Sequence, residues 1–308
     1  DVLSKIDYEN NTIDINGQTY KIENPCCQTV NPKQPLQLTK AEQEVLDSLM
    51  YSFQHSLKMK KHMEFLMKHG SMYLIYNQHL LYHGCIPLAQ SGELINFTVG
   101  NDSYQGAALL DFFEKHLKES FRNLDTHEDF ATDLSWYAWC GPFSPLFGKH
   151  KMTTFERYFI KDKRTHLERK NAYYQYRDSA KVCQLILEAF GLNPEFSRII
   201  NGHTPVKTTK GESPIRGDGH LFVIDGGLSK AYQKQTGIAG YSLLNNSYGF
   251  QIVTHQPFIS TDYLFNQQTD MTAIKRVVDK VAKRTLIKDT TIGREIQVKK
   301  QKLQSQLQ

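Results

Sequence analysis

The segment that most constrains the fold is residues 198–205, where a short apolar run is followed at once by a glycine and a histidine. Ile199 and Ile200 are β-branched and predict a buried strand, and Gly202 allows the backbone to turn tightly. His203 then lies at the mouth of a sheet, where metals and substrates bind in α/β proteins. The pattern predicts either a functional histidine or a hydrogen-bonded structural one, and the local sequence leaves both open.

A second strand with a histidine at its end lies upstream. Residues 80–82 are apolar, and His83 and Gly84 follow them. Two imidazoles on the ends of buried strands are candidate ligands of one metal ion. His83 taken alone could equally be a core imidazole with its hydrogen bonds satisfied, so the pair carries the argument.

Composition excludes several classes of protein. The chain has 308 residues, of which 40% are hydrophobic and 22% charged, as in globular proteins rather than disordered or fibrous ones. A net charge of +5 suits anionic small molecules but is too small for a nucleic-acid-binding protein. The sequence contains no apolar run of the ~20 residues that a membrane span needs. Five scattered cysteines without a Cys-x-x-Cys motif predict a reducing, cytoplasmic location.

Hydrophobic periodicity predicts a mixed α/β chain. Asn16-Gly17 predicts a type I′ hairpin turn, and Thr39 with Glu42 predicts a capping box at the start of a long helix. Residues 125–151 read as irregular, and 161–178 as an exposed lid or connection. The expected elements are hairpins at 12–22 and 72–83, helices at 39–70, 104–120, 181–190 and 270–284, and strands at 199–201, 220–225, 240–244 and 250–255.

The loop after His203 is locally basic. Lys207, Lys210 and Arg216 could hold a phosphate group, although an ordinary solvated loop has the same composition. Asp225 ends the next strand and could orient a histidine ligand as a hydrogen-bond acceptor, or simply cap a turn.

Several other histidines have spacings that a metal site could use. None is convincing, because the flanking residues do not predict a strand that ends at the pair, or because the helical spacing lacks an i, i+4 pair. These residues are Asp125 with His127, Asp218 with His220, and the helical set His55, His62 and His69.

Four motifs in order along the chain resemble those of the bacterial class III fructose-1,6-bisphosphatases. They are residues 83–88 (HGCIPL), 152–159 (MTTFERYF), 201–207 (NGHTPVK) and 224–232 (IDGGLSKAY). That family is similar to the calcineurin-like metallophosphoesterases, and the resemblance weakens only in the glutamine-rich tail.

The resemblance implies a fold and a chemistry. The fold would be a four-layer α/β/β/α sandwich, here its later half with family-specific helices. Its domains would be 1–70 (hairpin and long helix), 71–268 (later half of the metallophosphoesterase domain) and 269–308 (helical tail). His83 and His203 would be ligands in a two-metal Mn²⁺ site that hydrolyses fructose 1,6-bisphosphate, with Asp225 behind them and Lys207, Lys210 and Arg216 on a substrate phosphate.

The sequence departs from the family pattern in one important way. The Gly-Asp-x-x-Asp-Arg-Gly and Gly-Asn-His-Glu motifs are absent, and both Asp-x-His matches come after His83. The resemblance therefore implies that this is the carboxy-terminal portion of such an enzyme. This portion would contain metal ligands but no other catalytic residue, and it would be inactive alone. Its partners would be the amino-terminal half of the same enzyme and further copies of itself in a homo-oligomer. Alternatives are a protein phosphatase or phosphodiesterase, or a non-catalytic module of the same fold.

Overall fold

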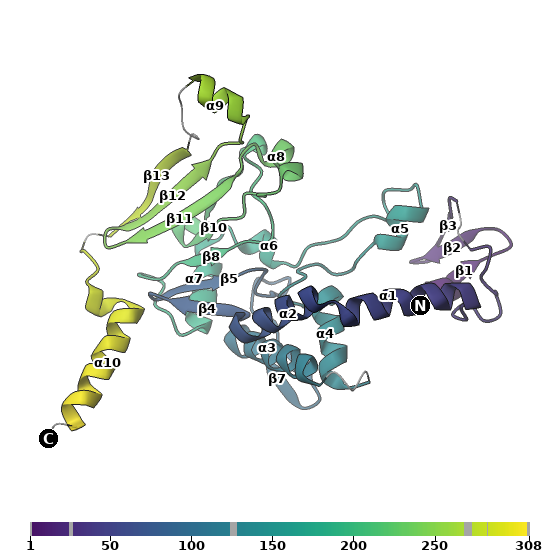
Figure 1. Ribbon diagram of the computed structural model, residues 1–308, viewed down its shortest axis with the longest axis horizontal. Coiled ribbons are helices and arrows are strands. Elements are labelled where there is room, and N and C mark those ends of the chain that lie inside the picture. Colours follow the sequence, from purple (N-terminus) through teal and green to yellow (C-terminus); the bar gives the residue numbers. More distant parts are fainter. Residues whose placement is uncertain (1, 25–26, 124–127, 268–272, 282, 307–308) are drawn as a thin grey trace. The chain divides into compact units, whose positions relative to one another are not determined.

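The computed structural model describes residues 2–24, 27–123, 128–267, 273–281 and 283–306. The chain forms two compact units, which are described separately. The first unit contains residues 1–70 and 149–169, and the second contains 71–148 and 170–308. The domain boundaries expected from the sequence lie instead after residues 70 and 268. Together the elements form a mixed α/β structure (Figure 1).

The first unit contains a small antiparallel sheet in the order β1-β2-β3. Asn16 and Gly17 have φ values of 55° and 76°, which confirms the predicted type I′ turn between β2 and β3. The elements of this unit are η1 (Leu3–Lys5), β1 (Ile6–Asp7), β2 (Thr12–Ile15), β3 (Gln18–Lys21), α1 (Lys40–His55), α2 (Leu57–His69) and α5 (Thr154–Phe159).

The long helix expected at 39–70 is two helices. Thr39 and Glu42 form the predicted capping box, in which the Thr39 side chain accepts from the Glu42 amide and the Glu42 carboxylate accepts from the Thr39 amide. Ser56 breaks the run, because it has an extended ψ of 103° and its hydroxyl accepts from the Met59 amide to cap α2. A serine in a helix interior favours such local hydrogen bonds, which explains the interruption.

The second unit is built on a five-stranded sheet in the order β4-β5-β8-β10-β9. The central strands β5 (His79–Tyr82), β8 (Ile199–Asn201) and β10 (Leu221–Val223) are parallel to one another. The edge strands β4 (Tyr73–Tyr76) and β9 (Ile215–Arg216) are antiparallel to their neighbours. The carboxyl ends of the three parallel strands therefore meet at one edge of the sheet.

The two faces of this sheet are covered differently. Leu80, Ile199 and Leu221 face one core with helices α3 (Gly106–Arg122) and α7 (Ala180–Ala189). The other face packs on a second sheet of three antiparallel strands, through Ile200 and Phe222 in contact with Phe250 and Ile252. The unit therefore stacks helices, a sheet and a second sheet (Figure 1). The second sheet consists of β11 (Gly240–Asn246), β12 (Gly249–His255) and β13 (Ala273–Lys280).

Two expectations about the secondary structure of the second unit were wrong. Residues 273–280, expected in a helix, form β13, because β12 offers a full edge for antiparallel pairing and Ile274, Val277 and Val278 suit a strand. Part of the region expected to be irregular forms α4, where the Asp129 carboxylate accepts from the Thr132 amide and caps the helix. Other elements of this unit are β6 (Phe97–Val99), β7 (Asp102–Tyr104), α4 (Phe130–Cys140), α6 (Tyr173–Tyr176), η2 (Thr208–Lys210), η3 (Gly217–Gly219), α8 (Lys230–Thr236), α9 (Thr261–Gln267), η4 (Ile287–Asp289) and α10 (Thr291–Gln306).

Within the described ranges, none of the helices combines the length and apolar character needed to cross a membrane. The cysteines among the same residues, Cys27, Cys85, Cys140 and Cys183, carry free thiols.

Because His79, at the start of β5, is largely buried, we expect the protein to lose stability in acid. Burial and the nearby Arg198 guanidinium lower its pKa from 6.5 to about 4, against a smaller opposing effect of Asp279. The folded state thus resists protonation, so this stability is present above pH 6.5 and is lost as the pH falls towards 4. We expect a loss of about 3 kcal/mol between pH 7.5 and pH 4 from this group.

The prediction is checked by urea unfolding across that range. His79→Gln retains a hydrogen-bond acceptor for the Arg198 amide, which now donates to Nδ1 of His79 at 3.2 Å. The variant should lack this part of the pH dependence. An unchanged slope in the variant would show that other groups cause the acid instability.

Candidate functional site

The edge where the parallel strands end brings together three of the predicted site residues. His83 directly follows β5, His203 lies two residues after β8, and Asp225 lies two residues after β10. Nδ1 of His203 is 3.2 Å from Nε2 of His83, and the ring planes are nearly perpendicular at 84°. Residues 120 positions apart in the sequence thus present two imidazole nitrogens to the same point.

The separation of these nitrogens fits one metal ion. Imidazole nitrogens bind zinc at about 2.0–2.1 Å, so two adjacent nitrogen ligands of one ion lie about 3 Å apart. Without an ion, a hydrogen bond between the two rings has the same length. Among the residues that the structure describes, no group of three His, Cys, Asp or Glu side chains is placed to hold a metal. The metal role of the pair therefore stays a prediction.

Asn201 holds the two strand ends in register. Its side chain is 2% exposed, and its Nδ2 donates to the carbonyl oxygens of His83 at 3.1 Å and Gly84 at 2.6 Å. The Gly202 amide also donates to the His83 carbonyl, at 3.2 Å. The backbone of His83 is thus fixed by the strand that delivers His203, which sets the distance between the imidazoles.

The glycines beside the histidines have different roles. A Cβ on Gly84 would lie 2.0 Å from the carbonyl oxygen of Pro145. This separation is too short for two non-bonded atoms, so only glycine fits at this position. A Cβ on Gly202 would lie no nearer than 3.6 Å to any neighbour. The left-handed conformation expected of a glycine is adopted by His203 itself, with φ of 66°. Such a conformation costs about 1–3 kcal/mol and is often kept where function needs it.

Asp225 makes the turn-capping contact that the sequence suggested as one alternative. Its Oδ1 accepts from the Gly227 amide at 2.9 Å, and its carbonyl oxygen accepts from the Val206 amide at 2.9 Å. The second contact ties the loop after His203 to the end of β10. The other role, in which the carboxylate orients a histidine ligand, stays a prediction.

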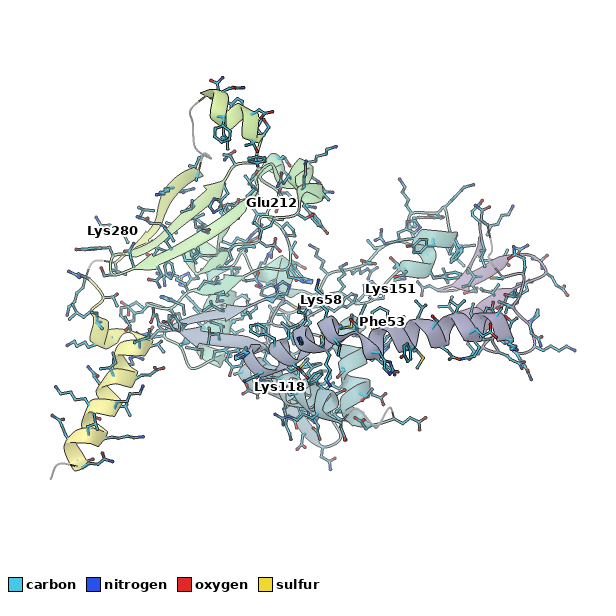
Figure 2. All side chains as sticks on the ribbon, in the orientation of Figure 1. Phe53, Lys58, Lys118, Lys151, Glu212 and Lys280 are labelled. Carbon is cyan, nitrogen blue, oxygen red and sulfur yellow. The ribbon has the colours of Figure 1, made fainter. Side chains whose placement is uncertain are left out.

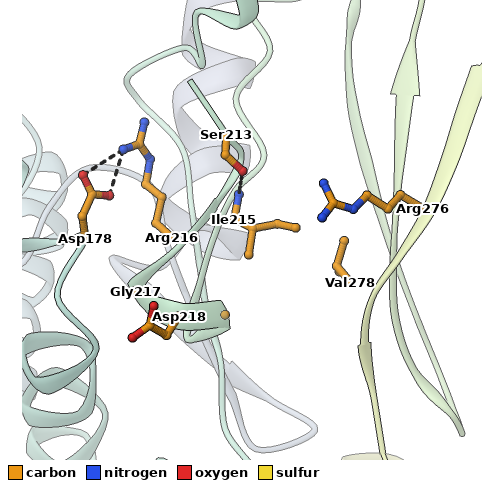
Figure 3. A pocket seen from close by; sticks show the side chains of 9 residues that line it. Asp178, Ser213, Ile215, Arg216, Gly217, Asp218, Arg276 and Val278 are labelled. Atoms are coloured by element: carbon orange, nitrogen blue, oxygen red, sulfur yellow. Dashed lines mark hydrogen bonds and ion pairs between the residues drawn. The ribbon is translucent and has the colours of Figure 1, made fainter. Parts of the chain in front are cut away.

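The basic residues of the following loop have different surroundings. Arg216 is only 13% exposed, and its Nη1 lies 2.8 Å from the Asp178 carboxylate. Glu212 lies 3.5 Å from the same guanidinium and also accepts from the Lys207 amide. Arg216 lines a pocket of about 530 Å³ opposite Arg276 of β13 (Figure 3). Its charge is therefore already balanced.

The alternative pair of Asp218 and His220 is not part of a metal-binding group among the residues that the structure describes. His220 is engaged by the Gly217 carbonyl at 2.9 Å and by the Gln184 side chain at 3.3 Å, and Asp218 has a left-handed φ of 51°. Asp125 and His127 lie outside the described residues.

Sequence reasoning missed two buried residues beside this edge. The segment 161–178 was expected to be exposed, yet Arg177 is 6% exposed and Tyr173 is fully buried. The hydroxyls of Tyr173 and Tyr82 are hydrogen-bonded at 2.9 Å. Tyr174 packs beside them, and burial raises its pKa. The cluster of tyrosines in this otherwise polar stretch is the feature of the sequence that could have indicated its burial.

Comparison with known proteins identifies the family. A family model described as Firmicute fructose-1,6-bisphosphatase matches residues 1–308. Relatives named fructose-1,6-bisphosphatase class 3 occur in Streptococcus sanguinis (57% identity over 302 residues, 98% of this chain and 48% of the relative) and Bacillus velezensis (52% over 295 residues, 96% and 46%). A Staphylococcus aureus relative of the same name is 51% identical over 296 residues, 96% of this chain and 45% of the relative.

The chain thus spans about half the length of the curated relatives it matches. No solved structure matches it. The family match covers every motif on which the resemblance was based, including the segments around His83, His203 and Asp225. The chain belongs to the Firmicute class III fructose-1,6-bisphosphatase family.

Proposed function

We propose that this protein serves in the metal-dependent hydrolysis of fructose 1,6-bisphosphate to fructose 6-phosphate and phosphate. The observation that carries the proposal is the pair of imidazole nitrogens 3.2 Å apart, at the carboxyl edge of a parallel sheet in a chain of this family. Two divalent cations, which we propose to be Mn²⁺, would supply the positive charge that polarises the phosphoryl group and activates water.

Each predicted residue has a place in this proposal. His83 and His203 are metal ligands, Asp225 orients the histidines, and Lys207 and Lys210 attract a substrate phosphate. Arg216 also belongs to that basic loop, although its ion pair with Asp178 limits what it can offer a ligand.

The remaining metal ligands would be carboxylates. We propose that they lie in parts of the full-length enzymes that the relatives have and this chain does not span. The stack of helices, sheet and second sheet would then belong to the four-layer sandwich of the calcineurin-like enzymes. Exposed apolar residues on the second sheet, Leu244 at 44% and Val277 at 58%, are consistent with a further layer there.

The experiment is to measure phosphate release from fructose 1,6-bisphosphate with Mn²⁺, for this chain and for the full-length enzyme. We expect turnover by the full-length enzyme, its loss in the double variant His83→Ala with His203→Ala, and none by the chain alone. Turnover of phosphodiesters or phosphoproteins in place of the sugar bisphosphate would favour the other phosphoesterase classes instead.

We also propose that the protein is a homo-oligomer that associates through α1 and α2. Val45, Leu49 and Phe53 share one face of α1 and are 54–61% exposed (Figure 2 labels Phe53). The net charge is −2 for α1 and +3 for α2, counted over their aspartate, glutamate and lysine residues. An antiparallel second copy would cover the apolar face and set opposite charges against each other.

Sedimentation velocity tests this association. Leu49→Asp should shift the protein to a smaller species, whereas Ser48→Asp, about 100° around α1 from Leu49 and outside the face of Val45, Leu49 and Phe53, should not. A monomer in the unchanged protein, or equal effects of both substitutions, would exclude this surface.

A further inference from the structure

Arg177 is a buried cation without a counterion among the residues that the structure describes. Its side chain belongs to a residue only 6% exposed, and its Nε and Nη1 atoms have no hydrogen-bond partner among the residues that the structure describes. The ion pairs found within those residues do not include it either. A buried charge without a partner is strongly destabilising, so such a group calls for a ligand or a functional reason.

Two other arginines of the same unit show how this fold normally treats a guanidinium. Arg198 is 17% exposed and lies 3.0 Å from Asp279, and Arg216 is 13% exposed and lies 2.8 Å from Asp178. Both are less buried than Arg177, and both have a carboxylate. The difference suggests that the position of Arg177 is kept for an anion that the chain does not itself provide.

Tyr174 and Thr204 connect Arg177 to the histidine pair. Its Cζ lies 5.1 Å from the centre of the Tyr174 ring. The Tyr174 hydroxyl is buried and has no hydrogen-bond partner within the described part of the chain. The Thr204 side chain approaches this hydroxyl, although the pair does not meet hydrogen-bond geometry. Thr204 directly follows His203, so Tyr174 connects the guanidinium to the candidate metal site.

The groups around this position are donors rather than anions. Burial raises the pKa of Tyr174, so its hydroxyl is neutral at pH 7. Within the described ranges, Nε and Nη1 of Arg177 and the Tyr174 hydroxyl have no hydrogen-bond partner, and such a set of donors matches a ligand with several anionic oxygens. A phosphoryl group is such a ligand, and arginine is the side chain best suited to it.

We propose that Arg177 and Tyr174 bind a phosphoryl group of the substrate beside His203. The substrate's identity rests on the proposed function, whereas the anionic class of ligand follows from the two donors alone. Arg177 would thus take the role that the sequence suggested for Arg216, whose guanidinium is already paired.

The first test is binding of inorganic phosphate to the purified protein, measured by isothermal titration calorimetry. Arg177→Met should raise the Kd by roughly 10- to 100-fold, as expected when one charge-assisted hydrogen-bonded partner is lost. Tyr174→Phe should raise it by about 3- to 10-fold. Arg198→Met is the matched control and should leave the Kd unchanged, because Arg198 precedes β8 at the opposite end of the strand from His203. An unchanged Kd in Arg177→Met would overturn the proposal.

The second test separates a binding role from a structural one. Arg177→Met should not lower the melting temperature without phosphate, because it removes an unpaired buried charge. Arg198→Met should lower it, because it leaves Asp279 without its partner. If Arg177→Met fails to fold, Arg177→Lys keeps the charge but loses the planar fork, and should still raise the phosphate Kd. A folded lysine variant with unchanged affinity would also contradict the proposal.

Kinetics distinguish this inference from the proposed function. In an enzyme active on fructose 1,6-bisphosphate, phosphate should inhibit competitively, and Arg177→Met should raise both its Ki and the KM. Non-competitive inhibition would place the phosphate elsewhere and overturn the inference. If the protein has no bisphosphatase activity while phosphate binding still depends on Arg177, the proposed function fails and the anion site stands.

Discussion

Replacing Gly84 with alanine is expected to lower the free energy of unfolding by at least about 3 kcal/mol. The new Cβ would lie 2.0 Å from the Pro145 carbonyl oxygen, which also accepts from the Cys85 amide at 2.9 Å. The Pro145 oxygen is a backbone atom that is already hydrogen-bonded to another backbone group. The clash therefore cannot be relieved by moving a flexible side chain. The loop would have to shift, and His83 would move with it. Urea unfolding of the variant measures the loss.

Gly202→Ala provides the matched control. This glycine lies beside the other histidine, but its Cβ would have only ordinary contacts, the nearest at 3.6 Å from Nδ1 of His83. We expect a change within about 1 kcal/mol. Wild-type stability of the Gly84 variant, or equal losses in both variants, would show that the close approach of residues 84 and 145 is not a constraint on the fold.

These two glycines show what the sequence could and could not predict about the site. The apolar runs around residues 80–82 and 199–201 were sufficient to predict β5 and β8, each with a histidine just beyond its end. Local sequence could not reveal that the strands are neighbours in parallel register, because pairing depends on residues far apart in the chain. Gly202, which was expected to allow a tight turn of the backbone, is the less constrained of the two.

The residues that support the site were harder to predict, because their roles depend on tertiary contacts. Asn201 reads as the last residue of a strand, yet its amide spans two strand ends. Arg177 lies in a charged stretch that composition assigns to the surface, and only packing shows that it is buried. The strand β13 was mistaken for a helix because pairing with β12 outweighs a weak local pattern. In each case long-range packing overrides local preference.

Removing the two imidazoles is expected to weaken Mn²⁺ binding by at least about 100-fold. Loss of groups that merely orient ligands already costs 10- to 100-fold, and these are the ligands themselves. His83→Ala and His203→Ala should each have a large effect, and the double variant little more, because each histidine is proposed to bind the same ion. Titration calorimetry with Mn²⁺ measures the change.

His220→Gln is the control for this series. Its imidazole is hydrogen-bonded to the Gly217 carbonyl and the Gln184 side chain. His220 is not one of the two proposed metal ligands. We expect wild-type Mn²⁺ affinity in this variant. Equal weakening by His220→Gln would indicate that histidines bind the ion non-specifically.

The central claim is that His83 and His203 bind one metal ion, and pulsed electron paramagnetic resonance of bound Mn²⁺ tests it most directly. The spectrum of the protein should show nitrogen coupling from two imidazoles, and each single alanine variant should retain coupling from only one. Mn²⁺ bound without nitrogen coupling, or a spectrum that neither substitution changes, would contradict the account.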